Sequence, residues 1–349
     1  MSACGANDEQ RRLAAAVARL LDVDGVTLTP LTSGTSRQTF SAATAGSAPR
    51  RFVLQQRLAG DHRDHLPAEE VARLLDAARA AGVQVVDTAD SYTGGTSERT
   101  IGGWLGGDPA RADMLVATKV GVREPYPTRD LSPAHVERAV TGSLRRLGRD
   151  RIDLFMSHRP DPAISARTVM ATFAGLVERG LVAHLGCCNV TAVELEQLLA
   201  AADELDVPRV EWVQNRFNVV VHAEQAEVLA LCRDAGLGFV AHSGLAGGVL
   251  GGRRVDAPAA AGSRLAVKPE VYDRYRAPEA ITAIARFGAA AAESGVPVAV
   301  LAQAWVLATP GVSGLVAGPQ RPEQVAGSVL AAGLPLDAGR HAQLAALFG

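Results

Sequence analysis

The stretch IDLFMSHRPDPAISARTVMATFAGLVERGLVAHLGCCNV, residues 152–190, places two short apolar runs on either side of a helical pattern. Ser165 precedes this pattern and Gly180 ends it, as is usual where helices start and stop. The apolar positions of the pattern recur at helical spacing and are Val169, Met170, Phe173 and Val177. Continuous apolar runs are typical of strands that are covered on both faces. The stretch therefore predicts a strand, a helix and a second, parallel strand.

The same alternation runs through most of the chain. It predicts eight strands, at Phe52–Gln55, Val83–Thr88, Leu115–Val120, Ile152–Ser157, Leu181–Cys187, Val210–Gln214, Gly238–His242 and Val312–Ala317. Two more helices have clear boundaries, one between Ser132 and Gly148 and one that starts with a capping box of Thr191 and Glu194. Eight strand–helix units in about 270 residues match a closed (β/α)8 barrel, which needs about 250. We therefore predict an α/β fold of the TIM-barrel class, with an open doubly wound sheet as the alternative.

Residues 1–50 have a different pattern. An amphipathic helix is expected around Leu13–Leu21, followed by short strands between Thr27 and Thr44 around a turn at residues 33–36. We expect residues 1–50 to form an N-terminal extension or cap and residues 51–349 to form the barrel.

The composition narrows the class of protein. The chain has 349 residues, of which 48% are hydrophobic, so a large core can form. The 35 Lys and Arg residues nearly balance the 37 Asp and Glu residues, which argues against nucleic acid or an anionic membrane as a partner. The start of the chain shows no secretory signal pattern. Residues 296–318 lack charge, but Pro297 and Pro310 divide them, so we expect a buried helix and a strand there rather than a membrane span.

The cysteines predict a cytoplasmic protein. The chain has four cysteines, with no C-x-x-C spacing and no matching histidine pair, which argues against a disulfide scaffold and against structural zinc. The adjacent Cys187 and Cys188 are expected to be packing residues of a buried strand, and a vicinal disulfide is the alternative.

Polar residues with possible chemistry follow three neighbouring strands. Asp87 lies at the end of the second predicted strand and Tyr92 follows it, Lys119 lies in the third, and His158 follows the fourth. In a barrel of this class the carboxyl ends of the strands carry the chemistry, so these side chains can converge. Taken singly, Asp87 could cap a helix, Tyr92 could be a half-buried aromatic and His158 a loop residue. Lys119 is harder to explain in this way, because the chain has only two lysines and a core strand penalises an unpaired charge.

The combination of a tyrosine, a lysine and a carboxylate is physically suited to proton transfer. The hydroxyl of a free tyrosine has a pKa of about 10, so it needs help to exchange protons near neutral pH. A lysine ammonium about 4 Å away stabilises the phenolate by about 4 kcal/mol at an effective dielectric constant of about 20. A carboxylate such as Asp87 keeps the lysine charged and oriented.

These motifs resemble the signatures of the aldo-keto reductases. The similarity rests on Asp87–Tyr92, Thr118–Lys119 and Ser157–His158, and it continues through Gly94–Glu98, Ile101–Gly102, His158–Pro162 and Gly186–Val190, over about 270 residues in total. The resemblance implies that Tyr92 delivers a proton to a substrate oxygen, that Lys119 and Asp87 tune Tyr92, and that His158 orients the carbonyl group. It also implies a nicotinamide cofactor, although the chain has neither the G-x-G-x-x-G pattern nor a P-loop.

The resemblance also assigns residues to this cofactor. They are Cys188, Asn189, Gln214, His242, Ser243, Leu245, Arg253, Gly318, Gln320, Arg321 and Gln324. Asn189 and Gln214 are expected at the nicotinamide carboxamide, and His242 where the family usually stacks an aromatic ring. Ser243, Leu245 and Arg253 match the pyrophosphate loop, and Gly318 to Gln324 match the adenosine-phosphate turn. Arg321 favours NADPH, with NADH as the alternative.

Some positions depart from the family pattern. The usual Gly-Thr after the first strand is replaced in the region Leu54–Arg57, the proline of the pyrophosphate loop is Gly244, and a late Asn is Ser328. These changes put cofactor affinity in doubt more than the type of reaction.

The sequence thus predicts a cytoplasmic reductase for a small-molecule carbonyl substrate that uses NADPH. We expect no nucleic acid or membrane partner and no metal site, and a monomer or weak homo-oligomer. The main alternative is an NADPH-binding regulatory subunit, because Arg159–Pro162 and Pro322–Gln324 are similar to potassium-channel β subunits. A degenerate barrel that acts as a scaffold is a third possibility. The substrate-facing loops do not identify the substrate.

Overall fold

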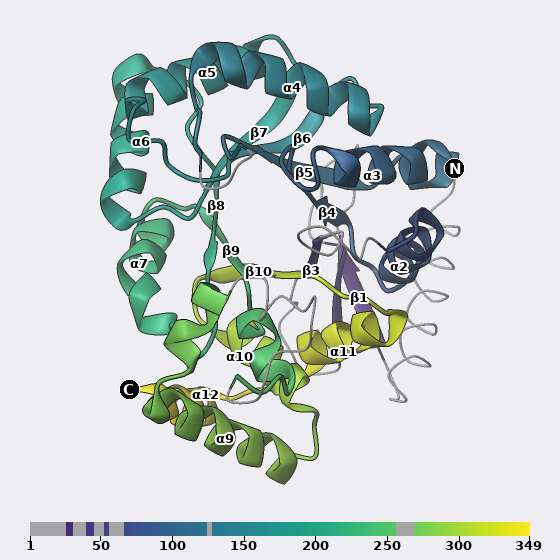
Figure 1. The fold of residues 1–349 in the computed structure, drawn as a ribbon, viewed down its shortest axis with the longest axis vertical. Helices are drawn as coiled ribbons and strands as arrows, with labels where there is room; N and C mark the ends of the chain where they lie inside the picture. The colour runs from purple at the N-terminus through teal and green to yellow at the C-terminus, as the bar shows by residue number, and fades with distance from the viewer. Residues whose placement is uncertain (1–25, 31–39, 45–51, 56–65, 124–127, 256–268) are drawn as a thin grey trace.

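Eight parallel strands close into a barrel in the computed structural model of the chain (Figure 1). The structure describes residues 26–30, 40–44, 52–55, 66–123, 128–255 and 269–349. The barrel strands are β3 (Phe52–Gln55), β4 (Val85–Asp87), β5 (Leu115–Val120), β6 (Ile152–Ser157), β7 (Val182–Cys188), β8 (Trp212–Arg216), β9 (Gly238–His242) and β10 (Val312–Ala317). They follow one another around the barrel, and β10 pairs with β3 to close it. The predicted fold class is confirmed.

Three strands differ in their bounds from the prediction. β7 is shifted one residue toward the C-terminus, to Val182–Cys188. β4 starts at Val85 because the Val83 N–H still donates to the Ala78 carbonyl at the end of the preceding helix, at 3.0 Å. β8 is shifted two residues toward the C-terminus, so that its last two residues are the polar Asn215 and Arg216. The prediction followed the apolar run, whereas the backbone ladder continues into the polar end of the strand.

Helices cover the outside of the barrel (Figure 1). They are α2 (Ala68–Ala80), α3 (Thr96–Gly106), α4 (Pro133–Leu147), α5 (Ala166–Glu178), α6 (Ala192–Leu205), α7 (Ala226–Asp234), α9 (Pro278–Glu293), α10 (Val298–Ala308), α11 (Pro322–Gly333) and α12 (Ala338–Ala345), with short 3-10 helices η1 (Pro109–Arg111), η2 (His222–Gln225), η3 (Ala246–Gly251), η4 (Pro269–Tyr275) and η5 (Ala346–Phe348). The predicted capping box starts α6: the Glu194 N–H donates to Thr191 Oγ1 at 3.2 Å, and the Thr191 N–H donates to Glu194 Oε2 at 2.8 Å.

The two adjacent cysteines pack as predicted. Cys187 and Cys188 are free and buried at the end of β7. Cys188 lies inside the barrel with Ala117 and Met156, and its Sγ is 3.7 Å from Met156 Sδ. Burial raises the pKa of the Cys188 thiol to about 12, so this sulfur stays protonated at neutral pH.

The uncharged segment forms α10 and β10, as expected, and most of α10 is buried. In the described parts of the chain, no single helix combines the length and apolar character needed to cross a membrane. Among the helices that the structure describes, one pair, α9 and α10, satisfies these criteria when taken together, and the two are bent by 97° at their junction.

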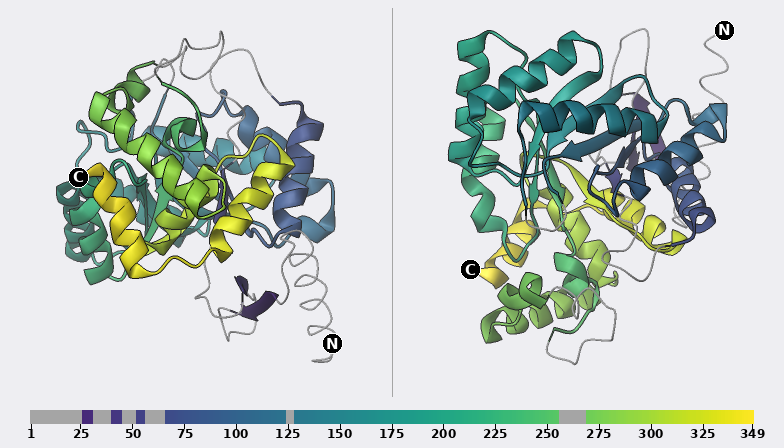
Figure 2. Two further views of the ribbon diagram at one scale, coloured as in Figure 1. Left: turned by 90° about the horizontal axis from the view of Figure 1, so that it is seen from below. Right: turned by 45° about the horizontal axis from the view of Figure 1, so that its top comes forward.

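Two strands near the N-terminus lie apart from the barrel (Figure 2). β1 (Val26–Pro30) and β2 (Phe40–Thr44) form a two-stranded antiparallel sheet, which starts one residue before the range Thr27–Thr44 where short strands were expected. The helix expected around Leu13–Leu21 and the turn at residues 33–36 lie outside the described residues. The boundary between residues 50 and 51 stays a prediction.

Candidate active site

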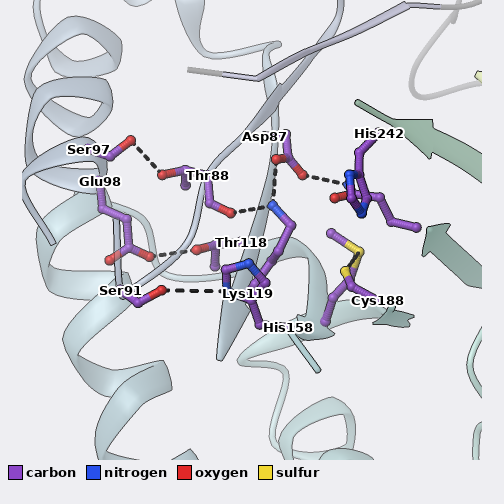
Figure 3. A network of polar contacts seen from close by, with 12 residues as sticks. Asp87, Thr88, Ser91, Ser97, Glu98, Thr118, Lys119, His158, Cys188 and His242 are labelled. Atoms are coloured by element: carbon purple, nitrogen blue, oxygen red, sulfur yellow. Dashed lines mark hydrogen bonds and ion pairs between the residues drawn. The ribbon is translucent and has the colours of Figure 1, made fainter. Parts of the chain in front are cut away.

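A buried ion pair lies at the carboxyl ends of β4 and β5. Lys119 Nζ is 2.5 Å from Asp87 Oδ1, and both side chains are at most 1% exposed (Figure 3). The same ammonium donates to the Thr88 carbonyl at 2.8 Å. Because β4 and β5 are adjacent and parallel, the two residues meet at one end of the barrel although 32 positions separate them.

The Asp87–Lys119 pair keeps the lysine ammonium charged inside the barrel. Burial by itself lowers the pKa of Lys119, but the facing Asp87 carboxylate, with Tyr92 and Cys188, raises it above its usual value. Lys119 is therefore a cation at neutral pH. Removing either partner would leave the other charge buried without compensation, which is strongly unfavourable.

Tyr92 and His158 lie beside this pair. Lys119 Nζ is 5.2 Å from the centroid of the Tyr92 ring. The Tyr92 and His158 rings pack edge to face, with centroids 5.5 Å apart and an angle of 77° between their planes. The structure thus brings the four predicted catalytic residues, Asp87, Tyr92, Lys119 and His158, into one group.

His158 is anchored at three points. Its N–H donates to the Val120 carbonyl at 2.8 Å, and its own carbonyl accepts a hydrogen bond from Asn189 Nδ2 at 3.0 Å. Its Nδ1 lies 3.5 Å from Ser91 Oγ (Figure 3). The loop after β6 is in this way tied to β5 and to the residue that follows β7.

Gln214 has a partner that the sequence did not predict. Its Nε2 donates to Asp87 Oδ2 at 2.8 Å across the barrel, from a position 127 residues away. Both oxygens of the Asp87 carboxylate are therefore engaged, one by Lys119 and one by Gln214. No local pattern could indicate this contact, because it depends on the closure of the barrel.

Asn189, His242 and Ser243 form a second polar chain. The Asn189 amide nitrogen faces the His158 carbonyl, so its oxygen faces His242, and His242 Nε2 must donate to it, at 2.9 Å. His242 Nδ1 then accepts from Ser243 Oγ in the neutral ring, at 3.0 Å. Asn189 and Ser243 have φ values of 57° and 59°, in the left-handed region that non-glycine residues seldom adopt. Backbone strain at both positions is consistent with a functional site.

A buried polar cluster lies between the strands β4 and β5 and the helices outside them. The sequence did not predict it as part of the site. Thr118 Oγ1 donates to Glu98 Oε1 at 2.7 Å, and Arg146 Nε donates to Glu98 Oε2 at 2.6 Å. Thr88 Oγ1 donates to Ser97 Oγ at 2.8 Å (Figure 3). These contacts tie the strands that carry Asp87 and Lys119 to α3 and α4. In the sequence, the Gly94–Glu98 stretch is the one indication of this cluster. Glu98 lies on a buried helix face, and a buried carboxylate requires a cation as partner.

Asp90 has an unusual environment two residues before Tyr92. Burial, and next the negative charge of Glu98, raise the pKa of Asp90 to about 7. Its Oδ1 is buried and has no hydrogen-bond partner among the described residues. A carboxylic acid that is neutral below this pH therefore lies in the loop that carries Tyr92.

The predicted pyrophosphate loop follows β9. Ser243 and Leu245 precede η3, in which Gly247 and Gly248 have φ values of 70° and 99°. A side chain at Gly248 would place its Cβ 3.4 Å from Arg253 Nε, so the exposed Arg253 lies directly over this turn. Arg253 Nη1 also donates to the buried Tyr272 hydroxyl, at 2.9 Å.

The predicted adenosine-phosphate residues gather at the start of α11. Gly318, Gln320, Arg321 and Gln324 are all exposed. The helix begins with Pro322 and has no side-chain cap, and the Gln324 side chain turns back to accept from the Gln320 N–H at 2.7 Å. Ser328 points elsewhere, since it is buried and its hydroxyl donates to Gln303 Oε1 at 2.7 Å.

The comparisons with known proteins identify the family. The family model for the aldo/keto reductase family matches residues 57–348, and the chain belongs to this family. An uncharacterized oxidoreductase of Bacillus subtilis, YrpG, is 31% identical over 276 residues, which cover 76% of this chain and 82% of the relative. A probable voltage-gated potassium channel subunit beta of Oryza sativa is 30% identical over 275 residues, covering 75% and 81%. Protein tas of Escherichia coli is 26% identical over 284 residues, covering 72% and 81%.

The predicted resemblance to the aldo-keto reductases is thereby confirmed. The family and the oxidoreductase among the relatives support an oxidoreductase that acts on carbonyl groups. In the described residues, no group of three or more His, Cys, Asp or Glu side chains is arranged to hold a metal ion.

Proposed function

We propose that this protein reduces an aldehyde or ketone to an alcohol with NADPH, and that Tyr92 donates the proton to the carbonyl oxygen. The observation that carries the proposal is the buried Asp87–Lys119 pair beside the Tyr92 ring, with the His158 ring packed against the same tyrosine. When bound, NADPH supplies the hydride that adds to the carbonyl carbon.

The chain's own groups fit such a cofactor. Two anion-accepting features support this fit: the tight glycine turn of η3 beneath Arg253, and the uncapped start of α11 beside the exposed Arg321. Members of the family generally use nicotinamide cofactors, typically NADPH. Asn189 and Gln214 would face the carboxamide, and Cys188 and His242 would lie near the nicotinamide. NADH is the alternative cofactor, and a comparison of the binding of NADPH and NADH tests it.

Each residue of the site has a separate role in proton transfer. Tyr92 loses its hydroxyl proton to the substrate oxygen, and the Lys119 cation stabilises the phenolate that remains. At a charge separation of about 4 Å and an effective dielectric constant of about 20, such an attraction amounts to about 4 kcal/mol. Asp87 and Gln214 keep the ammonium oriented, and His158 donates a hydrogen bond that aligns the substrate carbonyl beside Tyr92.

The test is NADPH oxidation by the purified protein with a panel of aldehydes and keto-sugars, beside the Tyr92→Phe variant and an NADH control. Calorimetric titration measures cofactor binding separately. Turnover by the wild type and its loss of at least a hundredfold in Tyr92→Phe are expected, because general acid catalysis contributes about 10²- to 10⁴-fold. Equal turnover by both proteins would remove Tyr92 from the reaction.

A regulatory role is the second candidate, and the relatives named as probable potassium channel β subunits favour it. It predicts that NADPH stays bound through purification, that no carbonyl compound is turned over, and that another chain copurifies with the protein. Turnover that depends on Tyr92, with no copurifying chain, would instead support the reductase.

We further propose a cytoplasmic protein that acts as a monomer or weak homo-oligomer on a small molecule, without a nucleic acid or membrane partner. Sedimentation at several protein concentrations tests the oligomeric state. A tight oligomer throughout would contradict this proposal.

A further inference from the structure

Two arginines beside the site have no role in the proposed proton transfer. Arg159 directly follows His158, and Arg216 is the last residue of β8, where its backbone pairs with His242 of β9. Both side chains are partly buried. They therefore occur at the carboxyl ends of the strands, where Tyr92 and Lys119 also lie.

The direction of Arg216 follows from its strand. Gln214 points into the barrel, since it contacts Asp87, and side chains in a strand alternate between the two faces. Asn215 points outward and bonds to the Val190 carbonyl at 2.7 Å and to Gln225 Oε1 at 2.8 Å. Arg216 thus lies on the same face as Gln214, one step closer to the mouth of the barrel.

The positive charge around Arg216 exceeds the nearby negative charge. Burial, and also the charges of Arg274 and Arg159, lower its pKa, with partial compensation from Tyr275 and Glu224. Glu224 is already paired, because both of its oxygens accept from Arg274 Nη1, at 2.8 and 3.0 Å.

Arg159 also has no neutralising partner among the residues that the structure describes. The acid closest to it in sequence, Asp161, accepts the main-chain N–H groups of Leu131 and Ala163, at 2.9 and 3.0 Å. Within the described ranges, neither Arg159 nor Arg216 forms an ion pair or a side-chain hydrogen bond. Partly buried cations without partners are unfavourable in the free protein, and a bound anion would compensate them.

We infer that the carbonyl substrate carries an anionic group, a carboxylate or a phosphate, which Arg216 and Arg159 bind while the carbonyl lies at Tyr92. The inference rests on the proposed function, because it specifies the substrate class of the same site. Guanidinium groups suit both anions, since they donate two parallel hydrogen bonds to either.

The first test compares substrates that differ only in charge. The pairs are 4-carboxybenzaldehyde with methyl 4-formylbenzoate, and glyceraldehyde 3-phosphate with glyceraldehyde. In the wild type, kcat/KM for at least one charged member should exceed that of its neutral partner by about tenfold or more. A ratio near one for both pairs would overturn the inference, and the pair that responds identifies the anion.

Variants test whether the two arginines cause the preference for charged over neutral substrates. Arg216→Gln and Arg159→Gln should each reduce the charged-to-neutral ratio by about tenfold, while Arg216→Lys should retain part of it. Arg167→Gln is the matched control, because Arg167 is 60% exposed and faces Glu204 on the helical surface, so the ratio should stay at the wild-type value. A ratio that is unchanged in both Arg216→Gln and Arg159→Gln would overturn the inference.

A binding measurement separates this inference from the proposed function. Calorimetry compares 4-(hydroxymethyl)benzoate with 4-methylbenzyl alcohol, which require no turnover. The wild type should bind the acid at least tenfold more tightly, and Arg216→Gln should lose this difference. If no aldehyde is reduced but this difference is seen, the anion site stands and the reductase proposal fails. Equal affinities for the two alcohols would refute the anion site, whatever the enzyme activity.

Discussion

Replacing Asp90 by asparagine should stabilise the folded protein more at pH 8 than at pH 5. In the fold, burial beside Glu98 raises the pKa of Asp90 from 3.8 to about 7. The unfolded chain therefore loses this proton at a lower pH than the folded chain, so the wild type becomes less stable as the pH rises through this window. Above about pH 7 the full penalty is reached, whereas the asparagine of the variant has no proton to lose.

The magnitude follows from the shift in pKa. A rise of about three units corresponds to about 4 kcal/mol at 1.36 kcal/mol per unit, as an upper bound for a side chain that keeps some exposure. At pH 5 less than half of this penalty is present, so the stability difference between variant and wild type should grow by about 2 to 3 kcal/mol from pH 5 to pH 8.

Urea unfolding at several pH values measures this difference. Asp203→Asn, at an exposed position of α6, serves as the control and should show no such trend. If the stability difference between Asp90→Asn and the wild type stays constant from pH 5 to pH 8, Asp90 is not a buried carboxyl group with a raised pKa.

Three further substitutions test other parts of the fold. Lys119→Met leaves the Asp87 carboxylate buried without its cation, so we expect a loss of about 3 to 5 kcal/mol in urea unfolding and no reductase activity; near wild-type stability would argue against the ion pair. Thr191→Ala removes the α6 cap and should lower stability by about 1 kcal/mol, with unchanged activity. Gly248→Ala forces a side chain into a φ of 99° beneath Arg253 and should weaken NADPH binding in calorimetry more than it alters the melting temperature; the reverse would make this glycine purely structural.

The barrel could be predicted from the sequence because its strands and helices are each marked by short, local sequence patterns. Each strand is a short apolar run, and each helix between Ile152 and Leu205 has a boundary signal beside it, such as the capping box at Thr191. The bounds of β4, β7 and β8 were less well predicted. At the end of β8, for example, Asn215 and Arg216 continue the backbone ladder after the apolar pattern has stopped.

The site was predictable only in part. Asp87 and Lys119 lie near the ends of neighbouring strands and His158 follows the next strand, so the fold class alone brings them close. The contact between Gln214 and Asp87 spans 127 residues, and the pairing of Arg146 with Glu98 joins two helices. Neither contact has a sequence pattern of its own, because each arises from the packing of finished elements against one another.

The hydrogen bond from Gln214 to Asp87 affects when, during synthesis of the chain, the candidate active site can be completed. Asp87 and Lys119 belong to the first half of the barrel, but one oxygen of the carboxylate receives its hydrogen bond only when β8 arrives from the second half. A ribosome-bound or truncated chain that ends before residue 212 would contain the charge pair without this donor. This group of residues is therefore complete only after the sixth of the eight barrel strands has been made, which is before β10 closes the barrel against β3.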